Sequence, residues 1–167
     1  YLFSKGADIN QKNKARDSAL IYACQGGYLD IVKYLIVNGA HIDDEDESKC
    51  TALYYSARAK RYDVLKYLIS NGANINHHNH DLETVLMRIV QDGNLEITQY
   101  LISKGADIFA VDQFKTPIMF FAANGGNCDI VKLLVEKGAP LQSRNIRGET
   151  VLIAAASAHD KDNSKTM

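Results

Sequence analysis

One stretch of eleven residues recurs through this chain at a fixed spacing. It reads DIVKYLIVNGA at residues 30–40, DVLKYLISNGA at 63–73, EITQYLISKGA at 96–106 and DIVKLLVEKGA at 129–139. The Gly-Ala pairs that close successive copies are 33 residues apart, and one further pair, at residue 6, keeps the same step. A constant period of this length indicates an array of stacked structural repeats, in which every copy folds as the same small unit.

Each copy has the sequence marks of a helix with defined ends. A carboxylate stands at the first position, where the helix dipole and the unpaired N–H groups favour negative charge. Apolar residues follow at helical spacing, as in Ile31, Leu35 and Ile36. The glycine near the end predicts a left-handed residue that terminates the helix. A second helix start, marked by Ser or Thr before a short apolar run, is predicted at Ser18, Thr51, Thr84, Thr116 and Thr150.

One repeat is therefore predicted to be a helix, a tight loop, a second helix and an extended loop of about ten residues, called a finger below. Such a unit cannot bury its apolar stripe without neighbours. The segment SALIYACQGGYLDIVKYLIVNGA at 18–40 resembles the ankyrin repeat, as do TPIM at 116–119, AANGG at 122–126 and KGAD at 104–107. The resemblance covers nearly the whole chain. It implies an all-α ankyrin-repeat solenoid of stacked antiparallel helix pairs with β-hairpin-like fingers.

The predicted domain organisation is one continuous array over residues 1–167. We expect the array to be a fragment of a longer chain, because it begins inside a helix pattern and ends without a partner helix. As a fragment it is expected to be monomeric. The predicted repeats are 18–50, 51–83, 84–115 and 116–149, with partial repeats at 1–17 and 150–167.

Composition excludes several classes of function. No apolar run reaches the roughly 18 residues of a membrane span, so no membrane insertion is expected. A net charge of −1 gives no general attraction to nucleic acid. Cys24, Cys50 and Cys128 share no metal or disulfide spacing, which favours an intracellular location, in the cytoplasm or alternatively the nucleus. No phosphate-loop, zinc-hydrolase or serine-nucleophile motif occurs, so no enzyme activity, cofactor or metal is expected.

Two polar clusters in the fingers each admit two interpretations. The five successive acidic residues 43–47 are interpreted as a solvated loop of mutually repelling charges, or alternatively as a contact for a basic partner. His77, His78 and His80 could suggest a metal site. Adjacent side chains in an extended loop diverge, however, and no second cluster supplies a further ligand, so exposed loop histidines are the preferred interpretation.

Some copies depart from the common pattern in their turns. Lys60-Arg61 replaces the glycine between two helices, which predicts a looser or different turn. The glycine expected in the finger turn is present only as Gly148, which predicts looser turns in the other fingers. The residues at those turns include Arg16, Lys49 and Leu82.

Other departures concern the first helices. Ile89 and Val90 replace small residues and are expected to widen the gap between neighbouring helices. Thr116 comes one residue early, so Pro117 is expected at the first helical position and an extra residue is expected inside the helix around Phe120. An inserted residue predicts a π-type bulge, with simple sequence drift as the alternative.

The family resemblance implies a non-catalytic scaffold that binds a partner protein on a concave face of finger tips and first helices. Phe114 is the preferred anchor, because an aromatic side chain at a finger tip suits an interface. The alternative for Phe114 is that it folds back over its own loop. Tyr55 beside Arg58 is the second choice.

Two further functions stay open. The array could be a targeting or autoinhibitory segment of a larger enzyme or substrate adaptor. It could also be a substrate of an asparaginyl hydroxylase at Asn10 and Asn76, which resemble the sites of that enzyme. The positions implied for partner binding are Lys14, Ala15, Asp17, Glu47, Ser48, Cys50, His80, Asp81, Glu83, Gln113, Phe114, Lys115, Ile146, Arg147 and Glu149 in the fingers, and Gln25, Tyr55, Arg58, Arg88, Gln91, Asp92 and Asn124 in the first helices.

Overall fold

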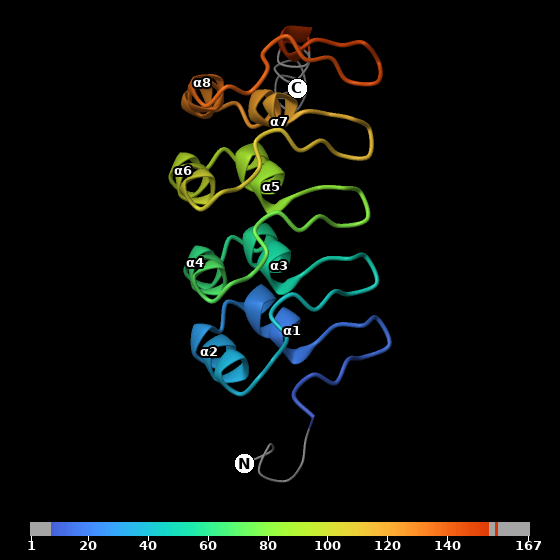
Figure 1. The fold of residues 1–167 in the computed structure, drawn as a ribbon, viewed down its shortest axis with the longest axis vertical. Coiled ribbons are helices and arrows are strands. Elements are labelled where there is room, and N and C mark those ends of the chain that lie inside the picture. Colours follow the sequence, from blue (N-terminus) through green and yellow to red (C-terminus); the bar gives the residue numbers. More distant parts are fainter. Residues whose placement is uncertain (1–7, 154–155, 157–167) are drawn as a thin grey trace, which may run out of the picture. The chain divides into compact units, whose positions relative to one another are not determined.

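A computed structural model describes residues 8–153 and 156 of the chain. The chain divides into two compact units, Tyr1–His80 and Asp81–Met167, which are described in turn. Helical residues occur again at 151–153. The first unit contains α1 (Ala19–Gly26), α2 (Leu29–Val37), α3 (Ala52–Arg58) and α4 (Tyr62–Ser70), and the second contains α5 (Val85–Gln91), α6 (Leu95–Ser103), α7 (Ile118–Asn124) and α8 (Cys128–Glu136) (Figure 1).

The first unit is built from two helix pairs. Helix α1 packs on α2, α3 packs on α4, and the two pairs meet through α1 against α3 and α2 against α4. The core between them is apolar, with Leu20, Leu53 and Leu65 fully buried. The fingers leave the helices on the same side of the unit (Figure 1). Each helix pair therefore buries its apolar stripe against its neighbour, as the repeat pattern predicts.

The second unit repeats this plan. Helix α5 packs on α6 and α7 on α8, while α5 meets α7 and α6 meets α8. Ile89, Val90 and Met119 fill the core between the first helices. Every helix in the described residues is short, since the longest have nine residues. A bilayer-spanning helix needs about 20 residues, so none of the described helices could cross a membrane.

Most of the predicted helix ends are confirmed. The side-chain oxygens of Ser18, Thr51 and Thr84 each accept a hydrogen bond from the backbone N–H three residues on, as N-cap residues do. The carboxylates predicted for the first turns of the second helices are also in place. After each second helix a glycine takes a left-handed conformation, with φ of 89° at Gly39 and 90° at Gly72.

The expectation for the fourth first helix is wrong. Helix α7 begins at Ile118, so Pro117 is its N-cap residue and Thr116 lies outside the helix. Pro117 comes 33 residues after Thr84, so the 33-residue period holds without a shortened finger and an extra helical residue. Helix α7 has seven residues, as α3 and α5 do, and contains no bulge. Thr116 instead donates its backbone N–H to Asp112 Oδ1 at 2.7 Å, which closes the finger turn.

The turns without glycine are not looser. In the fingers φ is 63° at Arg16, 57° at Lys49 and 55° at Lys115, close to the 74° of Gly148. Between α3 and α4, Lys60 likewise has a φ of 57°, and its N–H bonds to Ala57 O at 3.0 Å. Both expectations of altered turns are therefore wrong, because hydrogen bonds that close each turn hold side-chain-bearing residues in a conformation that favours glycine.

Replacing the left-handed lysines with glycine is expected to stabilise the protein. The left-handed conformation costs a residue with a side chain about 1–2 kcal/mol, and a glycine avoids this cost. The greater freedom of glycine in the unfolded chain offsets about 0.5–1 kcal/mol of that stabilisation. Lys49→Gly and Lys115→Gly should therefore each raise the free energy of unfolding by about 0.5–1 kcal/mol in urea denaturation followed by circular dichroism. Gly148→Ala serves as the reverse control and should lower it. Destabilisation by both lysine substitutions would contradict this account.

Candidate functional site

The backbone of four finger tips is fixed by a side chain at the start of the turn. Asp46 Oδ1 accepts the N–H groups of Ser48 and Cys50, both at 2.8 Å. Asn145 Oδ1 accepts those of Arg147 at 2.9 Å and Glu149 at 3.1 Å. Asn13 and Asp112 make equivalent bonds in the other fingers. Because the turn backbone is held this way, the tip side chains are presented from a fixed scaffold.

Neighbouring finger tips are joined by backbone hydrogen bonds, called rungs below. In the first unit, Glu47 N–H donates to Ala15 O at 3.2 Å and His80 N–H donates to Ser48 O at 3.0 Å. In the second unit, Gln113 N–H donates to Asp81 O at 2.8 Å. Gln113 Nε2 also donates to Asp81 Oδ1 at 2.8 Å. Gln113 and Asp81 are both predicted partner-binding residues. In this structure their side chains bond to each other within the second unit.

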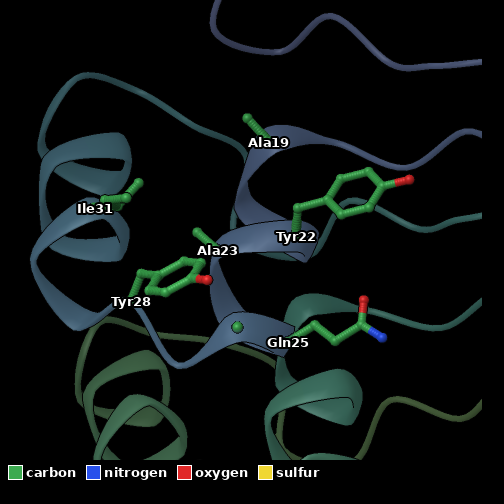
Figure 2. A pocket seen from close by; sticks show the side chains of 7 residues that line it. Ala19, Tyr22, Ala23, Gln25, Tyr28 and Ile31 are labelled. Atoms are coloured by element: carbon green, nitrogen blue, oxygen red, sulfur yellow. The ribbon is translucent and has the colours of Figure 1, made fainter.

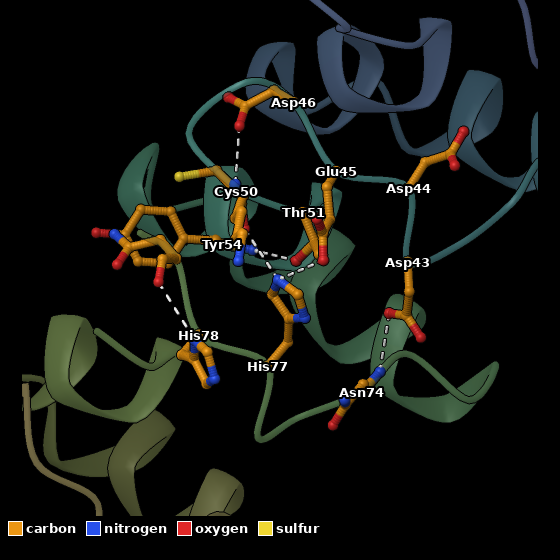
Figure 3. A network of polar contacts seen from close by, with 12 residues as sticks. Asp43, Asp44, Glu45, Asp46, Cys50, Thr51, Tyr54, Asn74, His77 and His78 are labelled. Carbon is orange, nitrogen blue, oxygen red and sulfur yellow. Dashed lines mark hydrogen bonds and ion pairs between the residues drawn. The ribbon is translucent and has the colours of Figure 1, made fainter. Parts of the chain in front are cut away.

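Three residues of the acidic finger, Asp44, Glu45 and Asp46, are at least partly buried. Asp44 pairs with Lys12 Nζ of the preceding finger at 2.9 Å. Asp43 Oδ1 accepts the backbone N–H of Asn74 at 2.9 Å, and Glu45 Oε1 lies 3.5 Å from His77 Nε2 (Figure 3). The expectation of a solvated loop is therefore wrong for these three residues, whereas Asp43 and Glu47 are exposed. The charges are tolerated because their partners come from the fingers on both sides, in sequence positions about one repeat away.

The histidine cluster is only partly exposed. His77 Nε2 lies 2.9 Å from Lys49 O, and its side chain is 19% exposed. The rings of His77 and His78 stack with centroids 6.0 Å apart and an interplanar angle of 17°, so these neighbours do not diverge as expected. The backbone N–H of His80 makes one of the rungs. Within the described residues, no group of three or more His, Cys, Asp or Glu side chains is placed to hold a metal ion.

The tips of the last two fingers enclose a cleft. It has a volume of about 230 Å³ and is lined by Phe114, Thr116, Asn145, Ile146 and Arg147. Phe114 is 53% exposed and Ile146 is 61% exposed. About half of the Phe114 surface is therefore accessible to a partner, and its role as an anchor stays a prediction.

A second pocket, open to solvent, lies beside α1 and α2 in the first unit. It has a volume of about 500 Å³, and Tyr22, Gln25, Tyr28 and Ile31 contribute to its lining (Figure 2). The hydroxyl of Tyr22 donates to Asp17 Oδ2 at 3.2 Å. Tyrosine hydroxyls and one amide are the polar groups of this lining, and neither is an acid or base at neutral pH. No sequence motif predicts this pocket, although its three large exposed side chains, Tyr22, Tyr28 and Ile31, are a signal that could have indicated it.

The comparisons with known proteins decide the family. A family model described as "Ankyrin repeats (3 copies)" matches residues 1–79 and 86–166, and one described as "Ankyrin repeats (many copies)" matches residues 57–102. The chain belongs to the ankyrin-repeat family. No curated protein matches it. The predicted all-α ankyrin-repeat fold is confirmed. Ankyrin repeats are generally protein–protein interaction modules and are typically non-catalytic.

The ankyrin-repeat positions predicted on the first helices fall into two groups. Arg58 and Gln91 are exposed, as are Gln25 and Asn124. Arg88 pairs with Asp92 at 3.0 Å on the same helix, and the Asp92 side chain is 10% exposed. The first group is open to a partner, whereas the Arg88–Asp92 pair is engaged within α5.

Tyr55 has an internal role in this ankyrin array. Its hydroxyl donates to Asp46 Oδ2 at 2.6 Å. Partial burial and this hydrogen bond raise the pKa of Tyr55 above its usual range. Burial also raises the pKa of the Cys24 thiol, to about 12, so this cysteine is not a nucleophile at neutral pH.

The two asparagines that resemble hydroxylation sites lie in different surroundings. Asn10 Nδ2 donates to Gly39 O at 3.1 Å, and Asn10 Oδ1 accepts the N–H of His41 at 2.9 Å. Asn76 is exposed, and its backbone N–H donates to Asn74 Oδ1 at 3.1 Å. Hydroxylation of either residue stays a prediction.

Proposed function

We propose that this chain is a non-catalytic module that binds a partner protein on its finger tips and on the exposed residues of its first helices. The observation that carries the proposal is the fixed backbone of the finger tips. Asx-type bonds hold the turns at Asn13, Asp46, Asp112 and Asn145, and three rungs join neighbouring tips. A loop that is ordered before binding loses little conformational entropy when a partner arrives.

The side chains at these tips support a binding role. Phe114 offers an exposed aromatic surface, and Arg147 offers an exposed guanidinium group in the same cleft. Aromatic and arginine side chains are enriched among the residues that dominate protein interfaces. In the first unit, Glu47 and Ser48 are exposed at a finger tip, and Arg58 is exposed on α3.

Site-specific photo-crosslinking tests the proposed face. A benzoylphenylalanine placed at Glu47, Phe114 or Arg147 of the full chain should cross-link a shared protein from a cell extract, because these positions lie on the tips. The same probe at Lys33 or Lys132, exposed on second helices α2 and α8, is the matched control and should capture none of that protein. The products are compared by gel electrophoresis and mass spectrometry.

Two results of the cross-linking experiment would contradict the proposed binding face. One is capture of the same protein from Lys33 and Lys132 with equal yield, and the other is absence of any product specific to the finger positions. Tyr55→Ala is unsuitable as a binding test, because it removes the hydroxyl that bonds Asp46 and would disturb the finger itself.

A further inference from the structure

The series of rungs stops at the last pair of fingers. The bonds from Glu47 to Ala15, His80 to Ser48 and Gln113 to Asp81 each join residues 32 positions apart. The next bond in this series would join Ile146 N–H to Phe114 O. In residues 81–153 of the second unit this bond is absent. The two tips separate at this point, and the cleft of about 230 Å³ lies between them.

The size of the cleft restricts what can occupy it. Small-molecule sites usually have volumes of about 300–1,000 Å³, and this cleft is smaller, at about 230 Å³. Phe114 and Ile146 present exposed apolar surface on its two sides. These dimensions suit one apolar side chain that projects from a longer chain, rather than a whole metabolite.

The exposed charged residues at the two tips, Lys115 and Arg147, are both positive. The carboxylates of the same fingers are engaged in their own turns, since Asp112 Oδ1 accepts two backbone N–H groups and Glu149 accepts Asn145 Nδ2 at 2.7 Å. A ligand at this cleft therefore meets two available cations beside an apolar surface, which favours acidic groups.

We propose that this cleft binds an acidic peptide segment of a partner protein. One aromatic or branched aliphatic side chain of the segment lies between Phe114 and Ile146, and carboxylates on either side of it pair with Lys115 and Arg147. The open N–H of Ile146 is available to a carbonyl of the peptide backbone. This inference rests on the proposed partner-binding function and specifies the chemistry of the partner.

Fluorescence anisotropy with a labelled Glu-Glu-Phe-Glu-Glu peptide and the full chain tests the proposal. The peptide should bind in low salt. Replacing its phenylalanine with alanine should weaken binding at least tenfold, and so should Lys115→Glu combined with Arg147→Glu in the protein. Lys33→Glu combined with Lys132→Glu changes two exposed cations on the second helices α2 and α8, away from the finger tips, and should leave affinity within twofold. Circular dichroism of each variant verifies that it is folded.

Several results would overturn the inference. They are the absence of binding at 1 mM protein, equal binding of a Lys-Lys-Phe-Lys-Lys peptide, or equal loss in both double variants. Tighter binding of a single-stranded oligonucleotide, or equal binding of the alanine peptide, would also overturn it, because an anion site needs no apolar side chain. If the peptide does not bind while finger-specific cross-linking to a protein persists, the proposal of an acidic, apolar ligand is overturned. The proposed partner-binding function then still stands.

Discussion

Replacing Asp46 with alanine is expected to destabilise the first unit by about 3 kcal/mol. The Asp46 side chain is buried, and it accepts the N–H groups of Ser48 and Cys50 and the hydroxyl of Tyr55. Hydrogen bonds to a charged group contribute about 1.5–3 kcal/mol each, and partial hydration of the released groups at a finger tip reduces the sum. Amide hydrogen exchange of residues 40–51 should become much faster, and the urea midpoint should fall.

The chain itself supplies the control for this substitution. Asparagine occupies the same turn position as Asn13 and Asn145, where its Oδ1 accepts the same type of backbone N–H. Asp46→Asn should therefore cost only about 1 kcal/mol, mainly through a weaker bond to Tyr55. Equal losses in the alanine and asparagine variants would show that charge matters rather than the backbone cap. An alanine variant as stable as the native protein would remove the assigned role.

Gly125→Ala is expected to destabilise the second unit by about 2–3 kcal/mol. A Cβ atom at Gly125 would lie 2.6 Å from Val90 O and 2.9 Å from Gln91 O. Both contacts are with backbone, so the helix ends must move apart, and overpacking of this kind costs about 1–3 kcal/mol. The gap between neighbouring first helices, expected to widen beside Ile89 and Val90, is therefore not widened at Gly125. Glycine has no side chain, so the backbones of α5 and of the turn after α7 can approach closely.

The neighbouring glycine is a matched control for Gly125. Gly126 has a φ of 68°, and nothing lies within 4 Å of a Cβ built on it. Gly126→Ala should therefore cost only the left-handed penalty, about 1 kcal/mol. Urea unfolding of both variants measures the difference. A larger loss for Gly126→Ala than for Gly125→Ala would contradict the assignment of close backbone approach.

The sequence determined the repeat unit and most of its boundaries. N-caps such as Ser18 and Thr51, the first-turn carboxylates and the terminating glycines act within one turn of the backbone, so their residue types carry the information locally. The period then fixes which helices are equivalent. Thr116 was misread because a Thr-Pro pair resembles a helix start, whereas the constant step assigns the N-cap to Pro117.

Tertiary structure decided the features that depend on residues about one repeat apart. The turns at Lys49 and Lys60 look wrong for a left-handed backbone, yet turn-closing hydrogen bonds outweigh a local preference of about 1–2 kcal/mol. The acidic finger finds its partners only when neighbouring fingers lie together. The cleft at Phe114 lies where one rung is missing, and no local residue pattern encodes a missing contact between segments 32 residues apart.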